Sequence, residues 1–382
     1  MAQTCDEEFV AEYVRLSDRL ALASFLHATG ERGQRADKEW RDYQQLLDDA
    51  REKRFADPAI RAKLLELRQF RAHPALPGGG RSDAYDAFVR YAASFRERMR
   101  ESADSVAADP SVAATLSSYQ RDFALGAGVA ERLGELEQRL DHALGRCRNV
   151  TLGEANLLDP DEAFRQLDAP LARHPTSAEL RECAAVLCRL DGRQSPPEAV
   201  AFHPINERRF FMVSTRRPPR CHVAIPSTIQ TLFELRCFAH EIGHTAGCGE
   251  AASDRDAFLG DSALPSEDTA YRYEVLLLEN LGLFSHLVES VGQCRRRLFL
   301  GRYLKFLLDA IKLKVALRFF TGCELRELNR AFCDVVCAQD PDFAPRSDLD
   351  FLAFCGIPAS FYQASDIEAF LQHYVPLAGE FG

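Results

Sequence analysis

The chain has 382 residues, of which 46% are hydrophobic and 27% are charged, a balance typical of soluble globular proteins. Its 57 acidic and 47 basic side chains give a formal net charge of −10, which argues against nucleic acid as a partner because phosphate binding favours a basic face. This composition also excludes disordered, collagen-like and disulfide-stapled classes, and the length allows two or three structural units.

The first half of the chain is predicted to be helical. Apolar residues between Phe9 and Leu26 recur every three or four positions, which predicts one amphipathic helix that ends near Gly30. Two shorter helices are expected to begin at Asp159-Pro160 and at Thr176-Ser177. Further helices are expected at 40–50, 57–70, 82–106 and 111–146, with a glycine-rich loop at 73–80.

The pattern changes between about residues 196 and 226. Phe210–Ser214 and Cys221–Ile225 are short, rich in β-branched and aromatic residues and bounded by prolines, so we expect two strands of a small sheet. Helical periodicity then returns at about 228–247, 266–290, 293–320, 323–338 and 366–375. The predicted fold is mainly α, a large helical body with a small β element preceding a central helix. We expect an N-terminal helical region over 1–195 and a second region over 196–382.

The twelve cysteines are scattered and form no C-x-x-C pair, which is typical of buried thiols in a reduced compartment. The acidic N-terminus lacks the features of a signal peptide. The most apolar stretch, 303–320, is interrupted by five charged residues and is not expected to cross a membrane. We therefore expect a cytoplasmic protein with no membrane partner, and the sequence does not predict its oligomeric state.

One short motif carries recognisable chemistry. His240-Glu-Ile-Gly-His244 is an H-E-x-x-H pattern within an apolar helical run. Two histidines at i and i+4 lie on one helix face, so both imidazoles can bind one zinc ion at about 2.0–2.1 Å. Glu241, next to the first histidine, is then placed to act as general base towards the attacking water. The motif predicts one zinc ion per chain.

A zinc site needs a third protein ligand, and spacing leaves it open among Glu267, Glu274, Glu279 and Glu250. Glu250 takes the position of the third histidine of metzincins, but that class has a downstream methionine, and the three methionines here all lie upstream. A second helix that begins near Pro265 is the better source, because Glu267 and Glu274 are seven residues apart and share one face. Two histidines and a glutamate with an open water position are the catalytic type of zinc site.

The stretch around the motif resembles the thimet oligopeptidase and oligoendopeptidase F family of gluzincin peptidases. That family has H-E-x-G-H and, about 25–29 residues after the first histidine, a glutamate ligand followed seven residues later by a second glutamate. Here Glu267 follows His240 by 27 residues, Ala270 is the small residue three further on, and Glu274 is seven further on. The resemblance implies His240, His244 and Glu267 as ligands, Glu241 as base and Glu274 as a helper behind a ligand.

The chain departs from that family in its short length and in the absence of a late loop rich in histidine and tyrosine. The tyrosines of that loop stabilise the developing oxyanion in the family. Tyr362 and Tyr374 are the late candidates for such a role here. His222, on the strand expected beside the motif, is a further candidate for contact with substrate or ligands.

These observations predict a zinc-dependent metallopeptidase, an endopeptidase of oligopeptidase type, acting on peptides or unstructured protein segments. One alternative keeps the metal site in a specialised zinc hydrolase, a tailoring enzyme or a protease with a single substrate. Another is a non-catalytic helical binding protein. The sequence predicts neither the substrate nor the cleavage preference.

Overall fold

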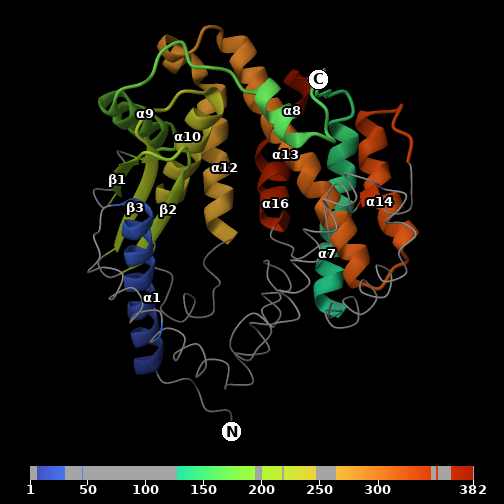
Figure 1. Cartoon of the computed structure of the whole chain (residues 1–382), viewed down its shortest axis with the longest axis horizontal. Helices are drawn as coiled ribbons and strands as arrows, with labels where there is room; N and C mark the ends of the chain where they lie inside the picture. The colour runs from blue at the N-terminus through green and yellow to red at the C-terminus, as the bar shows by residue number, and fades with distance from the viewer. Residues whose placement is uncertain are drawn as a thin grey trace. The chain divides into compact units, whose positions relative to one another are not determined.

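The computed structural model of the chain describes residues 7–30, 45, 127–193, 200–216, 219–246, 264–345, 350–351 and 363–381. Most of these residues are helical, and three strands form one small sheet, which confirms the mainly α class for this part of the chain (Figure 1). The helices expected at 57–70 and 82–106, the loop at 73–80 and, apart from residue 45, the helix expected at 40–50 lie outside the described residues.

The chain divides into two compact units, each built from two stretches of sequence. The first unit comprises Met1–Leu64 and Leu167–Gly301, and the second comprises Leu65–Gln166 and Arg302–Gly382. The division expected after residue 195 falls within the first unit. The helices α8 (Pro160–Leu167) and α13 (Val291–Phe320) contribute residues to both units.

The first unit contains the sheet and the helices that cover it. Its described elements are α1 (Glu7–Ala28), α9 (Ser177–Leu190), β1 (Val200–Ile205), β2 (Phe211–Arg216), β3 (Pro219–Pro226), α10 (Leu232–Ala246), α12 (Leu264–Glu279) and the 3-10 helix η2 (Leu281–Leu287). The predicted end of α1 near Gly30 and the predicted start of α9 are confirmed, and α9 begins with a reciprocal capping box between Thr176 and Glu179. Gly30 follows α1 with a φ of 72°, a conformation that glycine adopts without strain.

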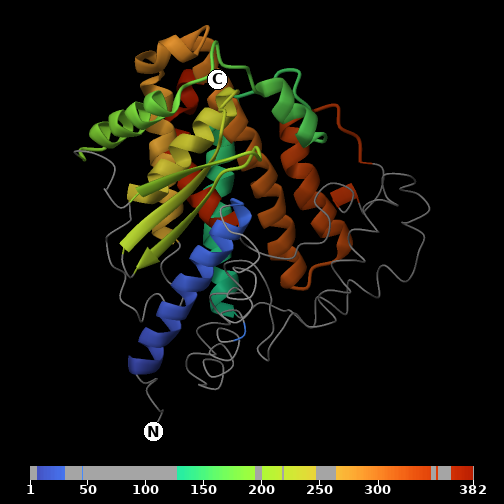
Figure 2. The ribbon, with the colours of Figure 1, turned by 60° about the vertical axis from the view of Figure 1, so that its left-hand side comes forward.

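The sheet has the order β1-β3-β2, with β3 parallel to β1 and antiparallel to β2 (Figure 2). Strands β2 and β3 are the two that the sequence predicts, whereas β1 is missed. The reason is Pro204, which cannot donate to a ladder and argues against a strand, yet is tolerated because β1 is an edge strand.

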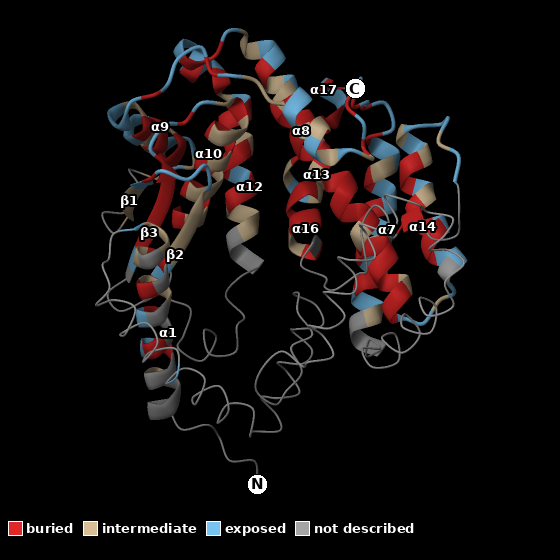
Figure 3. Cartoon of the chain, in the orientation of Figure 1, coloured by how far each residue is buried: buried red, intermediate tan, exposed pale blue. Residues whose placement is uncertain are grey.

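Alternation of side chains gives the sheet two different faces. On one face, Phe25 of α1 packs against His203 and Phe211, with ring centroids 5.0 and 5.1 Å apart respectively. On the other face, Phe202 of β1 contacts Phe238 of α10, with centroids 6.1 Å apart. The sheet therefore separates α1 from α10, and burial is greatest along β3 (Figure 3).

Helix α10 is held at its N-terminus by groups that satisfy its first free backbone donors. The amide of Leu232 donates to the carbonyl of Ala169, and the amide of Phe233 donates to the Asp168 carboxylate over 3.0 Å. Thr231 and Glu234 form a capping box, because the Glu234 amide donates to the Thr231 hydroxyl and the Thr231 amide donates to the Glu234 carboxylate. These contacts fix where α10 begins and how it is directed.

The C-terminus of α10 is held by a cluster that follows α9. Arg193 donates to the carbonyl of Ala246, one of the last in α10. The same guanidinium bonds Asp191 over 3.0 Å, and Asp191 pairs with Arg272 of α12 over 2.5 Å. Segments near residues 168 and 193 therefore anchor the two ends of α10.

The helix expected over 266–290 is shorter than predicted. α12 ends at Glu279, and a 3-10 segment, η2, continues the chain from Leu281. Asn280 stands at the break, where its side-chain amide donates to the Leu276 carbonyl over 2.9 Å, and Gly282 follows. Both residue types have low helix propensity and outweigh the apolar periodicity here.

The second unit is a packing of helices. Its described elements beyond the shared helices are α7 (Ala127–Arg146), α14 (Leu325–Gln339), α16 (Gln363–His373), η3 (Val375–Leu377) and α17 (Ala378–Phe381). Phe306 of α13 stacks on Phe370 of α16, with centroids 4.2 Å apart. Lys305 of α13 also pairs with Asp366 of α16 over 2.9 Å, so apolar and ionic contacts join these two helices.

The expectation of buried thiols holds for only part of the described cysteines, because Cys147, Cys183, Cys188 and Cys294 are buried whereas Cys237, Cys323, Cys333 and Cys337 are half-buried. Eight described cysteines are free, and burial raises the pKa of Cys147 to about 11 and that of Cys183 to about 12, so these thiols are unreactive at neutral pH. Cys221 of β3 is disulfide-bonded, so the expectation of reduced thiols throughout is wrong at this residue. Among the described helices, none combines the length and the apolar character that crossing a membrane requires.

Candidate metal centre

Helices α10 and α12 lie unusually close together where Gly243 meets Ala270. A Cβ atom added to Gly243 would lie 2.5 Å from the Ala270 Cα atom and 2.8 Å from the Thr269 carbonyl oxygen. Only glycine allows this approach, because both neighbours are backbone atoms that cannot move aside independently. The contact brings the face of α10 that carries His240 and His244 against the face of α12.

Three side chains from these helices converge. The Nε2 atoms of His240 and His244 are 3.0 Å apart, and Glu267 carboxylate oxygens lie 3.5 Å from the first and 3.7 Å from the second. Ligand atoms about 2.0–2.1 Å from one tetrahedral zinc ion are about 3.4 Å from one another, so this spacing fits a single ion. In the part of the chain that the structure describes, it is the only such group of three histidine, cysteine or carboxylate ligands.

Glu274 stands behind the first histidine rather than beside the second. Its Oε1 accepts a hydrogen bond from His240 Nδ1 over 2.6 Å, and its side chain is fully buried. Because a carboxylate only accepts, this bond places the ring proton on Nδ1 and leaves the Nε2 lone pair for a metal. Among the four carboxylates that the sequence left open, Glu267 thus has the geometry of a ligand and Glu274 that of a supporting group.

Glu241 follows His240 directly and is partly buried. Burial raises the pKa of its carboxyl to about 6; His240 opposes the shift, and the carboxylates of Glu267 and Glu274 add to it. A carboxyl group that titrates near neutral pH can both take up and release a proton under ordinary conditions. The site therefore combines three atoms that could bind a metal ion with a carboxyl group that can exchange a proton.

The remaining candidates from the sequence do not join this cluster. His222 projects from the face of the sheet that packs on α1, where its Nδ1 lies 3.1 Å from His203 Nε2 and its ring lies against Phe25. Glu279 is exposed at the end of α12. Tyr374 belongs to the second unit, is fully buried and stacks on Phe370. Glu250 and Tyr362 lie outside the described residues.

The residues that hold α10 in place are not among the site residues predicted from the sequence. Asp168 and Arg193 act from distant segments, and no local pattern marks them. The capping box was visible as Thr231-x-x-Glu234 directly before the apolar helical run. Arg236, one turn before His240, is nearly fully buried, and nothing in its spacing distinguishes it from a surface arginine.

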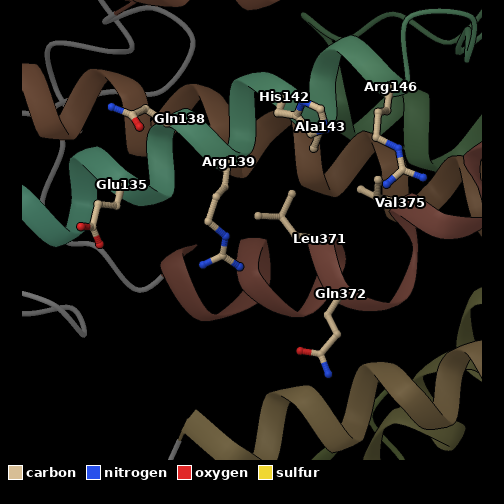
Figure 4. A pocket seen from close by; sticks show the side chains of 9 residues that line it. All are labelled: Glu135, Gln138, Arg139, His142, Ala143, Arg146, Leu371, Gln372 and Val375. Carbon is tan, nitrogen blue, oxygen red and sulfur yellow. The ribbon is translucent and has the colours of Figure 1, made fainter.

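A separate groove of about 610 Å³ lies in the second unit between α7 and the α16–η3 segment (Figure 4). Exposed side chains of both charge signs line it, among them Glu135, Arg139 and Arg146. Arg139 already pairs with Glu368 over 3.2 Å. These features are typical of a solvated hollow on a helical surface, and we assign no ligand to it.

Comparison of the chain with protein-family models, with curated proteins and with solved structures finds no match. The resemblance to gluzincin peptidases therefore rests on the motif, on the spacing of its glutamates and on the geometry that these residues adopt.

Proposed function

We propose that the chain is a zinc-dependent metallopeptidase in which His240, His244 and Glu267 hold one zinc ion and Glu241 is the general base. The observation that carries this proposal is the convergence of three ligand atoms within 3.0–3.7 Å of one another, directly beside the partly buried carboxyl group of Glu241. Three protein ligands leave a tetrahedral ion one open position, as in catalytic sites, whereas structural zinc sites are usually closed by four.

Each side chain has a distinct part in the hydrolysis of a peptide bond. When bound, zinc supplies a Lewis acid that polarises the substrate carbonyl and favours ionisation of the attacking water. A Glu241 carboxylate oxygen accepts a proton from this water as the water oxygen bonds to the carbonyl carbon. The same carboxyl then donates the proton to the amide nitrogen as the C–N bond breaks, which releases a carboxylic acid and an amine. Glu274 holds His240 throughout.

The substrate class is peptides or unstructured protein segments, as in the family that the motif resembles. A second candidate function keeps the metal, its ligands and the base but serves one precursor peptide or one specialised substrate. It is favoured by the absence of a late tyrosine-rich loop and by the enclosure of Tyr374 in a helical core. A missing oxyanion donor lowers the rate on ordinary peptides by roughly 10²–10³-fold where it has been measured in other enzymes.

Incubation of the purified chain with a mixed peptide pool, followed by mass spectrometry, tests the proposal. We expect cleavage that requires zinc and that is lost with a chelator and in the variant Glu241→Gln. Cleavage that persists in both controls would contradict the proposal. A chain that holds one zinc ion but leaves the whole pool intact would favour the specialised substrate.

A further inference from the structure

Arg236 is a buried cation that the proposed chemistry does not use. Its side chain is 10% exposed, and its Nε and Nη1 atoms are buried without a hydrogen-bond partner. A buried guanidinium is unfavourable unless opposite charge or an aromatic face compensates it. The residue therefore needs a physical reason for its position.

Two neighbours compensate the charge. The guanidinium carbon lies 4.8 Å from the centroid of the Phe233 ring, a cation–π contact within the same helix. Arg236 Nε lies 3.9 Å from Glu274 Oε2, and the Glu274 side chain is fully buried. The guanidinium is thus an opposite charge facing a carboxylate that solvent cannot reach.

The two carboxylate oxygens of Glu274 face different partners. Oε1 accepts the Nδ1 proton of His240 over 2.6 Å, while Oε2 faces Arg236. His240 and Arg236 are one turn apart on α10, so a carboxylate from α12 lies between them. A carboxylate drawn towards both partners cannot rotate without giving up one of them.

We propose that Arg236 is a positioning residue of the metal centre: its guanidinium holds the Glu274 carboxylate in place, and Glu274 in turn fixes the ring orientation and tautomer of His240. This inference rests on the proposed zinc site but extends it to a residue that touches neither metal nor substrate. Groups that orient a ligand from behind typically change metal affinity by roughly 10–100-fold when they are removed.

Zinc affinity of the full chain, measured by competition with a chromophoric chelator, tests this role independently of activity. We expect Arg236→Met, which keeps the length but removes the charge, to weaken zinc binding by roughly 10–100-fold. Arg236→Lys should recover part of that loss because it restores the positive charge. The visible spectrum of the cobalt-substituted protein should change in Arg236→Met, since the orientation of His240 changes.

Three further variants separate positioning from general stability. Arg208→Met removes an arginine that also pairs with a carboxylate of α10, Glu234, over 2.7 Å, and should leave zinc affinity unchanged. Phe233→Leu removes the aromatic partner of Arg236 without touching Glu274 and should also bind zinc normally. The double variant Arg236→Met/Glu274→Gln should be no weaker than Glu274→Gln alone, because both changes break the same contact.

The outcomes are distinguishable. A wild-type chain that binds no zinc would overturn the proposed metal site itself. Normal zinc binding by the wild type, with the same affinity and cobalt spectrum in Arg236→Met, would overturn only the role of Arg236. If Arg236→Met does not fold, Arg236→Lys provides the test. A zinc affinity and a cobalt spectrum equal to those of Glu274→Gln would contradict the role of the positive charge. Values between those of the wild type and those of Glu274→Gln would support it.

Discussion

In the proposed metal centre, three side chains are assigned separate tasks. His240 keeps its ring proton on Nδ1 and offers Nε2 to the metal, Glu241 takes up a proton, and Glu267 offers a carboxylate oxygen. Because the base and the ligands are different side chains, they can be removed one at a time. Changes at single residues therefore separate loss of metal from loss of chemistry.

Glu241→Gln should bind zinc like the wild type but cleave peptides roughly 10²–10⁴ times more slowly, since an amide cannot accept the proton of the attacking water. Metal content and turnover measured on the same preparation check this expectation. Glu279→Gln, an exposed change on α12, is the matched control and should leave both unaltered. Loss of zinc from Glu241→Gln would contradict the division of tasks.

Glu267→Ala and Glu274→Ala should differ in metal content. The first change removes a ligand and should leave little bound zinc after dialysis against buffer that contains a weak chelator. The second should lower the affinity by roughly 10–100-fold and retain zinc when the metal is in excess. If zinc were lost only from Glu274→Ala, Glu274 would be the ligand and Glu267 the supporting residue, which would contradict the assignment.

Gly243→Ala should lower the free energy of unfolding by about 1–3 kcal/mol, because the new methyl group would overlap the Ala270 backbone and force α10 from α12. It should also weaken zinc binding, since the ligands come from both helices. Gly134→Ala is the control: a helical glycine with nothing within 4 Å of an added Cβ, where alanine should be neutral or stabilising. Thermal unfolding of both variants tests this difference.

The side chains that cluster between α10 and α12 are ones that the sequence singles out, for a physical reason. His240 and His244 share a face through helical periodicity alone, and Glu267 and Glu274 share one through their spacing of seven. Which glutamate becomes the ligand depends on the register between two helices, and that register is set by the contact of Gly243 with Ala270. Arg236 could not be predicted, because burial of a charge depends on tertiary packing rather than on local pattern.

At the scale of elements, the start of α10 is the best-defined feature. Hydrogen bonds of the first turn involve Asp168, Thr231 and Glu234, so the direction of α10 does not depend on packing alone. Burial alone would raise the pKa of Glu234, but hydrogen bonds from Arg208 and from the amides of Gln230 and Thr231 outweigh it and hold the pKa below its ordinary value.

Glu234→Ala should lower the free energy of unfolding by about 1 kcal/mol at neutral pH, the usual effect of losing a cap. The pKa of Glu234 is lower in the folded state than in the unfolded state. Its contribution to the free energy of unfolding is therefore complete above the ordinary glutamate pKa of 4.5 and is lost as the pH falls through the folded-state pKa. The variant and the wild type should therefore become more alike in acid. Denaturant unfolding between pH 7 and pH 3 tests the trend, with Glu207→Ala, an exposed carboxylate paired with Arg209, as a control expected to have little effect.

Helices whose capping residues or apolar periodicity are clear in the sequence agree with their predictions. Elements whose conformation depends on tertiary contacts do not. The capping residues Thr176 and Glu179 mark the start of α9, and the apolar run marks α10. β1 escapes detection because Pro204 contradicts its intrinsic preference, and only pairing with β3 makes it a strand. The end of α12 is misplaced because apolar periodicity continues through the 3-10 turns of η2.

At the scale of the whole molecule, all proposed zinc ligands belong to the first unit. A ligand stabilises only the folded state that binds it, by about 4 kcal/mol when its free concentration is 1,000 times the dissociation constant. Calorimetry of the full chain with excess zinc and with a chelator should therefore shift the unfolding transition of the first unit and leave that of the second unit in place. Equal shifts of both transitions, or none, would contradict this expectation.

The interleaving of the two units has a consequence for the order in which the protein is made. Asp168 and Arg193, which anchor α10, are synthesised before it, and Glu267 and Glu274 are synthesised after it. A nascent chain that has reached Gly301 already contains every residue assigned to the metal centre. The second unit instead joins Leu65–Gln166 to Arg302–Gly382 and must wait for the last part of the chain. Every residue of the proposed zinc site is therefore available on the ribosome before translation of the second unit is complete.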